Sequence, residues 1–205
     1  MLLAIDTSAG TSVAVTDGAR GLSVERSVDD TMRHAEVVGA LVRECLDVAG
    51  IRPAELDGVV AGMGPGPFTG LRVGIAAARV FALARGIPLL PVVSHAAIAV
   101  DHYAGGGDGR VLVVTDARRR ELYWSIFDAP AVPGVPLLVE GPGLAAPADV
   151  PAGMPRIDAG RVPAAALGLL AERMRAAGAG FPADQALYLR TPDVTPAAGP
   201  KRVTA

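Results

Sequence analysis

The chain has 205 residues, of which 51% are hydrophobic and 20% are charged, and its net charge is −2. This length and composition predict one sizeable globular domain or two small ones, with enough apolar side chains for a real core. The low charge and the single lysine, Lys201, exclude an extended phosphate-binding surface, because tight nucleic-acid binding relies on clustered cations.

The chain begins with a predicted hairpin. Residues 2–6, LLAID, are an apolar run that ends in Asp6, small turn residues follow, and residues 12–16 then alternate apolar and polar side chains. This pattern predicts two strands with Asp6 at the bend, and a third strand is expected over 21–26.

A helix is predicted next, running to about Ala49 and ending at Gly50, because acidic and capping residues precede it. One face of this helix is apolar at three- and four-residue spacing, at Ala35, Val38, Val42, Cys45 and Ala49. Further apolar residues widen that face beyond what one sheet needs.

The most informative stretch is residues 58–86, GVVAGMGPGPFTGLRVGIAAARVFALARG. It predicts a buried strand over 59–61, a glycine-rich loop, and a helix that begins with Thr69 as N-cap and ends at Gly86. Small residues recur every fourth position in this helix, at Gly70, Gly74, Ala78 and Ala82. We expect this strip to be a flat surface for another protein's helices, so that leucine at Gly74 or Ala78 would obstruct the contact and leave most of the fold intact.

Beyond this stretch we expect a strand over 89–93, a helix over 94–103 and a domain boundary at the glycine cluster 105–109. Residues 111–128 then repeat the opening hairpin, with Asp116 at the bend, which implies two halves of a duplicated architecture. The density of proline and glycine over 129–163 predicts no long element there, apart from a possible short strand at 137–139. A helix over 164–177, a short strand over 186–189 and a mobile tail over 191–205 complete the prediction.

A strand, an aspartate and a turn of small residues, found twice, form the framework of the actin, hexokinase and Hsp70 superfamily, in which two such hairpins hold the phosphates and metal of ATP. Asp6, Thr7 and Ser8 fit the first hairpin, whereas Asp116 is followed by Ala117 and three arginines where small residues are expected. Asp6 is therefore either an architectural residue that caps its own turn or a ligand of a vestigial nucleotide site. Arg118, Arg119 and Arg120 either contact phosphate or form a solvated, ion-paired turn.

The other chemical signals are weak. The loop 62–70 matches neither the dinucleotide-binding nor the P-loop pattern, and the HExxH and GxSxG motifs are absent. His34 has valine four residues later, so no histidine pair can hold a metal there, and we expect no metal site. Cys45, the only cysteine, excludes an internal disulfide and is best interpreted as a core residue. No apolar run approaches the ~20 residues of a membrane span and the start lacks the features of a signal peptide, so a cytoplasmic protein is expected.

Four segments together resemble the bacterial TsaB (YeaZ) family: LLAIDTS at the start, GMGPGPFTGLRVG in the middle, TDARRRELYW at the second hairpin and YLR near residue 190. The resemblance covers about residues 1–128, and GPGPFTGLR is its specific signal. It implies an α/β, two-lobed actin-like (ASKHA) fold, a duplicated ribonuclease H-like architecture with a shortened second lobe. The lobes are expected over 1–104, which carries the partner-binding helices, and over 105–190.

The same resemblance implies a function. TsaB proteins look like degenerate paralogues of TsaD, the subunit that transfers threonylcarbamoyl to adenosine 37 of tRNA. We therefore expect a non-catalytic scaffold subunit that pairs with TsaD, is joined by the ATPase TsaE, contacts tRNA only through the complex and forms a homodimer when alone. No cofactor is expected, and ATP or ADP only at the complex interface. The expected partner-binding residues are Ala35, Val38, Val42, Cys45, Leu71, Gly74, Ile75, Ala78 and Phe81.

Two alternatives stay open. A small ATP-dependent kinase or ATPase of the same superfamily would need an intact second phosphate hairpin and a glycine-rich adenosine segment. A self-sufficient homodimeric regulator would not need TsaD. Some family members carry a peptidase label, but this sequence contains no peptidase motif.

Overall fold

The structure is a computed structural model that describes residues 1–30, 32–132 and 134–190, so the predicted tail over 191–205 lies outside the described residues. Its main elements are β1 (Leu2–Asp6), β2 (Thr11–Asp17), β3 (Leu22–Val28), α1 (His34–Ala49), β4 (Gly58–Gly62), α2 (Phe68–Arg85), β5 (Leu89–Val92), α3 (Ser94–Ala104), β6 (Arg110–Asp116), β7 (Leu122–Val132), β8 (Val135–Ala145), β9 (Arg156–Asp158) and α4 (Ala164–Ala176). None of the helices in these ranges has the length and apolar character needed to cross a membrane.

Two sheets share one topology. The first has the strand order β3-β2-β1-β4-β5 and the second the order β8-β7-β6-β9. In each sheet the first strand pairs antiparallel with the second and parallel with the fourth. The registers also agree, because Asp6 pairs with Ser12 and Asp116 pairs with Leu122, six residues on in both hairpins. The predicted two-lobed, duplicated actin-like α/β fold is confirmed, and the second sheet has no counterpart of β5 among the described residues.

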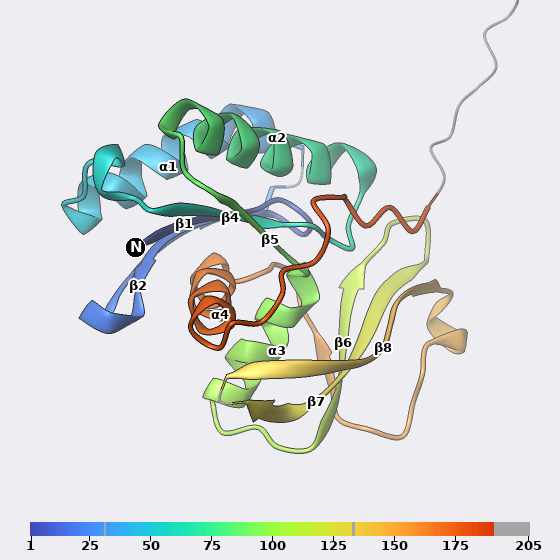
Figure 1. The fold of residues 1–205 in the computed structure, drawn as a ribbon. Helices are drawn as coiled ribbons and strands as arrows, with labels where there is room; N and C mark the ends of the chain where they lie inside the picture. Colours follow the sequence, from blue (N-terminus) through green and yellow to red (C-terminus); the bar gives the residue numbers. More distant parts are fainter. Residues whose placement is uncertain (31, 133, 191–205) are drawn as a thin grey trace, which may run out of the picture.

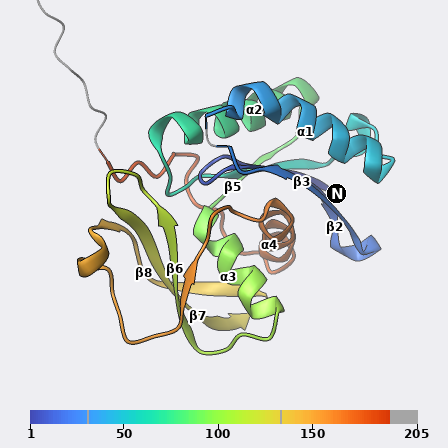
Figure 2. The ribbon, with the colours of Figure 1, turned by 180° about the vertical axis from the view of Figure 1, so that it is seen from behind.

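The molecule is layered. Figure 1 shows α1 and α2 side by side on one face of the first sheet, with α3 and α4 on its other face, toward the second sheet. Figure 2 shows the same layers from behind. Although α4 follows the second sheet in sequence, it packs on β1 and β2, where the Thr16 hydroxyl donates a hydrogen bond of 2.6 Å to Glu172. The helix predicted within 105–190 therefore covers the first sheet.

The core has two large apolar clusters, one above the first sheet and one below it, and a smaller third cluster on the second sheet around Leu112, Ile126 and Val150. The upper cluster joins α1 and α2 to strand residues such as Leu3 and Val59. The lower cluster joins α3 and α4 to both sheets, through residues such as Val60 and Phe127. Each central strand of the first sheet is therefore buried on both sides, which explains its nearly unbroken apolar sequence.

Three local predictions are wrong. Helix α2 begins at Phe68 with Pro67 as its N-cap, and Thr69 makes no capping bond. Residues 129–163 contain the 11-residue strand β8, because β8 is an edge strand and an edge strand tolerates proline, which lacks a backbone donor. Residues 186–189 form no strand, although the Leu187 amide donates a 2.8 Å hydrogen bond to the Met63 carbonyl.

His95 joins the two halves of the chain inside this core. It lies at the start of α3, is fully buried, and is 2.9 Å from the hydroxyls of both Ser125 and Thr115 on the second sheet. Burial lowers the pKa of His95 to about 3, so the imidazole is neutral at physiological pH.

This burial predicts loss of stability in mild acid. The unfolded chain binds a proton at His95 below about pH 6.5, whereas the folded chain does not until about pH 3, so stability falls as pH decreases through that window. Between pH 7 and pH 5 the free energy of unfolding should fall by about 2 kcal/mol from this residue. Urea denaturation at the two pH values measures the fall. The His95→Gln variant lacks this group and keeps only the contribution of His34, whose pKa burial also lowers, so an equally large fall in that variant would contradict the assignment.

Candidate functional site

Asp6 ends β1 and is buried, with 1% of its surface exposed. One carboxylate oxygen accepts hydrogen bonds from the Ser8 amide (2.8 Å) and the Ser8 hydroxyl (2.6 Å), and the other accepts one from the Ser94 hydroxyl (2.5 Å). Burial raises the pKa of Asp6, and the hydrogen bonds from Ser8 and Ser94 oppose that rise. Both oxygens are thus engaged within the chain, which favours the architectural interpretation of Asp6.

Thr7, the next residue, lies directly beneath α2. Its hydroxyl donates to the Gly70 carbonyl (2.6 Å) and accepts from the Gly74 amide (2.9 Å). A Cβ atom at Gly70 would lie 2.6 Å from the Thr7 carbonyl oxygen, and one at Gly74 would overlap the Thr7 hydroxyl. The glycines of α2 therefore allow this helix to approach the turn of the first hairpin.

His34 begins α1 and is 7% exposed. Its Nδ1 atom is 2.7 Å from the Thr11 hydroxyl, and burial lowers its pKa, an effect that the nearby Asp6 carboxylate opposes. The position four residues later is the buried Val38. Among the described residues no group of three or more histidine, cysteine, aspartate or glutamate side chains could hold a metal ion.

The turn of the second hairpin differs from the first. Arg118, Arg119 and Arg120 all have positive φ, between 55° and 63°, a conformation that costs non-glycine residues energy. Ion pairs surround the turn, with Arg118 beside Asp116 at 3.4 Å and Arg190 beside Glu121. Of the two interpretations of the three arginines, phosphate contact or an ion-paired turn, this geometry favours the ion-paired turn.

A hollow of about 580 Å³ lies between the two turns and the starts of α1 and α2. Its lining includes Ser8, His34 and Thr69 from the first lobe, and Arg118 from the second. The polar side chains of Asp6 and Thr7 do not line it and are bonded internally. The three residues predicted for a vestigial nucleotide site, Asp6, Thr7 and Ser8, are all buried. Of these three residues, only Ser8 lines the hollow.

The structure places most of the predicted partner-binding residues inside the protein, which corrects that prediction. Six of them are buried against the first sheet: Val38, Cys45, Leu71, Gly74, Ile75 and Ala78. Val42 and Phe81 are partly buried, and Ala35 is exposed. The Cys45 thiol donates to the Val13 carbonyl at 3.2 Å, and burial raises its pKa to about 11. The small-residue strip is therefore the inner face of α2. Its small side chains are needed there because the helix lies close to Thr7.

The opposite faces of the two helices carry exposed residues of which the sequence prediction named only Ala35. Small or apolar side chains on these faces are exposed at Ala35, Gly39 and Ala40 of α1 and at Ala76, Val80 and Leu83 of α2, and we call these six residues the outer helix face. Val80 is 66% exposed and Leu83 is 83% exposed. Isolated apolar residues on a surface are normal, whereas exposed apolar residues gathered on two packed helices are typical of an interaction surface. Their spacing of three and four residues was the signal that could have identified them.

Comparison with known proteins adds a family context. Residues 30–129 match the family model of TsaD, tRNA N6-adenosine threonylcarbamoyltransferase. An uncharacterized protein of Mycobacterium tuberculosis is 40% identical over 211 residues, which cover 96% of this chain and 95% of that protein. The tRNA threonylcarbamoyladenosine biosynthesis protein TsaB of Escherichia coli is 32% identical over 128 residues, which cover 62% of this chain and 54% of TsaB.

Two solved structures from Pseudomonas aeruginosa are similar over nearly the whole chain. One, described as YeaZ, has a TM-score of 0.78 and 27% identity and covers 92% of this chain and 99% of its own. The other, described as an uncharacterized protein with similarity to peptidase YEAZ, has a TM-score of 0.79 and 29% identity with the same coverage.

Proposed function

The chain belongs to the TsaB (YeaZ) family, and on this premise we propose that it is a non-catalytic subunit in the biosynthesis of threonylcarbamoyladenosine on tRNA, where it binds and stabilises TsaD. The observation that carries the scaffold role is the outer helix face. Two adjacent helices present exposed small and apolar side chains on a chain whose central strands are already covered on both sides.

A helix-on-helix contact suits this surface. Gly39, Ala40 and Ala76 would let a partner helix approach closely, and Val80 and Leu83 would supply apolar area that is now in water. Paired helices from each partner would form a four-helix contact. A second copy of the chain can use the same surface when TsaD is absent, so we propose a homodimer for the isolated protein.

The geometry of the polar residues supports a non-catalytic subunit. Asp6 has both carboxylate oxygens bonded to Ser8 and Ser94, which disfavours the kinase or ATPase alternative. The Ser125–His95 pair has the residue types of a peptidase site, yet both residues are fully buried and His95 has a pKa of about 3. A substrate cannot reach that pair, and such an imidazole is too weak a base to activate serine.

The remaining partners follow from the same proposal. TsaE would join the complex formed with TsaD, and tRNA would be held by the complex, because this chain has a net charge of −2. We propose no cofactor for the isolated chain, with ATP or ADP only at the complex interface. Modification of tRNA would place the protein in the cytoplasm.

Size-exclusion chromatography with light scattering tests the scaffold role directly. The protein is run alone and with TsaD encoded in the same genome, and we expect the free protein to shift to a stoichiometric complex. Formation of threonylcarbamoyladenosine by TsaD should then depend on adding this chain. A free protein that never associates with TsaD, or one that hydrolyses ATP with turnover alone, would contradict the proposal.

A further inference from the structure

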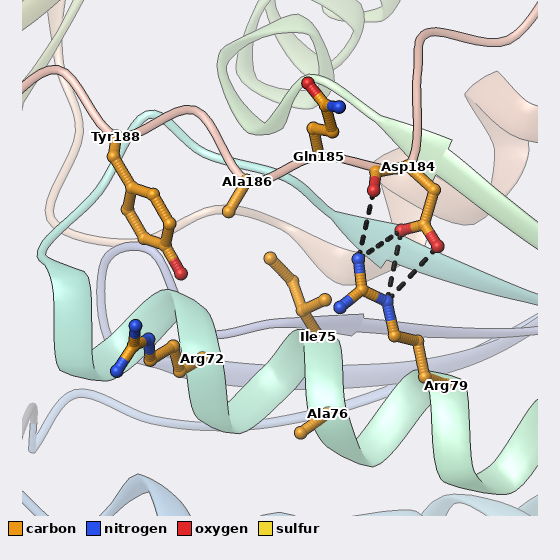
Figure 3. Close-up of a pocket in the computed structure, with 8 residues that line it drawn as sticks. All are labelled: Arg72, Ile75, Ala76, Arg79, Asp184, Gln185, Ala186 and Tyr188. Atoms are coloured by element: carbon orange, nitrogen blue, oxygen red, sulfur yellow. Dashed lines mark hydrogen bonds and ion pairs between the residues drawn. The ribbon is translucent and has the colours of Figure 1, made fainter.

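An open groove runs along α2 next to the outer helix face. Residues 184–188, which follow α4, form its opposite wall, and its volume is about 660 Å³. Figure 3 shows Arg72, Ala76 and Arg79 on the α2 side, with Tyr188 and Asp184 across from them. Ile75 and Ala186 give the groove an apolar floor. Ala76 belongs both to the groove and to the outer helix face, so the two surfaces are continuous.

The two arginines of the groove lie seven residues apart on one side of α2. Arg79 holds the Asp184 carboxylate, with its Nη2 atom 2.7 Å and its Nε atom 3.2 Å from the same oxygen, and its Nη2 also donates to the Asp184 carbonyl at 3.0 Å. The chain itself therefore demonstrates how an arginine in this groove receives a carboxylate.

Arg72 occupies the equivalent position two turns earlier, but its surroundings differ. No carboxylate of the described residues is within ion-pair distance of Arg72; its guanidinium lies 3.6 Å from the centre of the Phe68 ring. Phe68 in turn packs on Tyr188, with ring centres 4.7 Å apart. Stacking on Phe68 therefore fixes the planar Arg72 cation in the lining of the groove without neutralising it.

The part of the groove around Arg72 and Tyr188 has side chains suited to binding a carboxylate. It offers an oriented guanidinium, the Tyr188 hydroxyl as a second donor and an apolar floor for the stem of an acidic side chain. We propose that the groove receives an aspartate or glutamate side chain from a segment of the partner protein that covers the outer helix face. This inference rests on the proposed function. A polyanion such as RNA is disfavoured, because the other arginine of the groove is already neutralised by Asp184.

The test measures binding of the 205-residue chain to TsaD by calorimetry at several salt concentrations. Arg72→Glu should weaken binding at least tenfold and make its salt dependence shallower, because one intermolecular ion pair is replaced by repulsion. Tyr188→Phe keeps the ring contact and removes only the hydroxyl, so a smaller loss of a few-fold is expected. Arg156→Glu is the matched control, because Arg156 is an exposed arginine on the second sheet that pairs with Asp158.

The outcomes separate the two proposals. If wild-type protein binds TsaD and Arg72→Glu, folded by its melting temperature, binds as tightly as Arg156→Glu, the groove inference is overturned while the scaffold role stands. If Arg72→Glu unfolds the protein, Tyr188→Phe decides: unchanged affinity and salt dependence overturn the inference. If the wild-type chain does not bind TsaD, both proposals are overturned.

Discussion

Replacing Leu83 with glutamate should abolish binding to TsaD and leave the fold intact. Leu83 is 83% exposed on α2, so the change removes few internal contacts and its effect on stability should stay within about 0.5 kcal/mol. In the proposed complex the same side chain is buried between helices, where an unpaired carboxylate is strongly unfavourable. We expect the affinity to fall at least about 100-fold, the effect of losing an interface hot spot.

Calorimetry and co-elution with TsaD measure this loss, and a melting curve checks the fold. Leu137→Glu is a suitable control, because Leu137 is 59% exposed on β8, far from the outer helix face in the layered fold. It should bind as the wild type does. Equal affinities for Leu83→Glu and Leu137→Glu, in well-folded proteins, would remove the outer helix face from the interface.

A valine at Gly74 should instead damage the fold. The added side chain would overlap the Thr7 hydroxyl and break two buried hydrogen bonds, from Thr7 to the Gly70 carbonyl and from the Gly74 amide to Thr7. Overpacking and loss of these bonds should together lower the free energy of unfolding by about 3–5 kcal/mol. The sequence alone predicted that a bulky residue at Gly74 or Ala78 would block only the partner contact.

Gly39 is the matched control for Gly74. It also lies within a helix, but a Cβ atom there would have no neighbour within 4 Å. Gly39→Val should therefore change stability by less than about 0.5 kcal/mol, since valine is a slightly better helix former than glycine. Urea denaturation of both variants compares them, and an equally small effect of Gly74→Val would mean that α2 does not lie against Thr7.

The sequence determined much of the architecture because its signals are local. Alternating and continuous apolar runs identified β1, β2, β4 and β6, and Gly50 and Gly86 ended α1 and α2 in the left-handed conformation expected of helix C-caps. The repeated hairpin with Asp6 and Asp116 predicted the duplication that the two sheets display. The GPGPFTGLR segment led to the family in which the comparisons place the chain.

Local sequence signals did not predict the strand that lies in the proline-rich segment. Strand β8 contains Pro136 and Pro142, and residues of this type are tolerated only because β8 lies at the edge of its sheet. A strand's place in a sheet depends on partners distant in sequence. The path of residues 184–190 likewise depends on contacts with α2 and the second hairpin, through Arg79 and Glu121.

The candidate interface shows most clearly what only the tertiary structure decided. Helical periodicity showed that Gly70, Gly74 and Ala78 share one face of α2. It also places Ala76, Val80 and Leu83 together, although the sequence prediction did not single them out. When a helix is apolar on more than one side, periodicity does not state which side meets the sheet. Packing settles this, because α2 can approach Thr7 only through its glycines. The larger residues Val80 and Leu83 are consequently left in water, where we propose that a partner covers them.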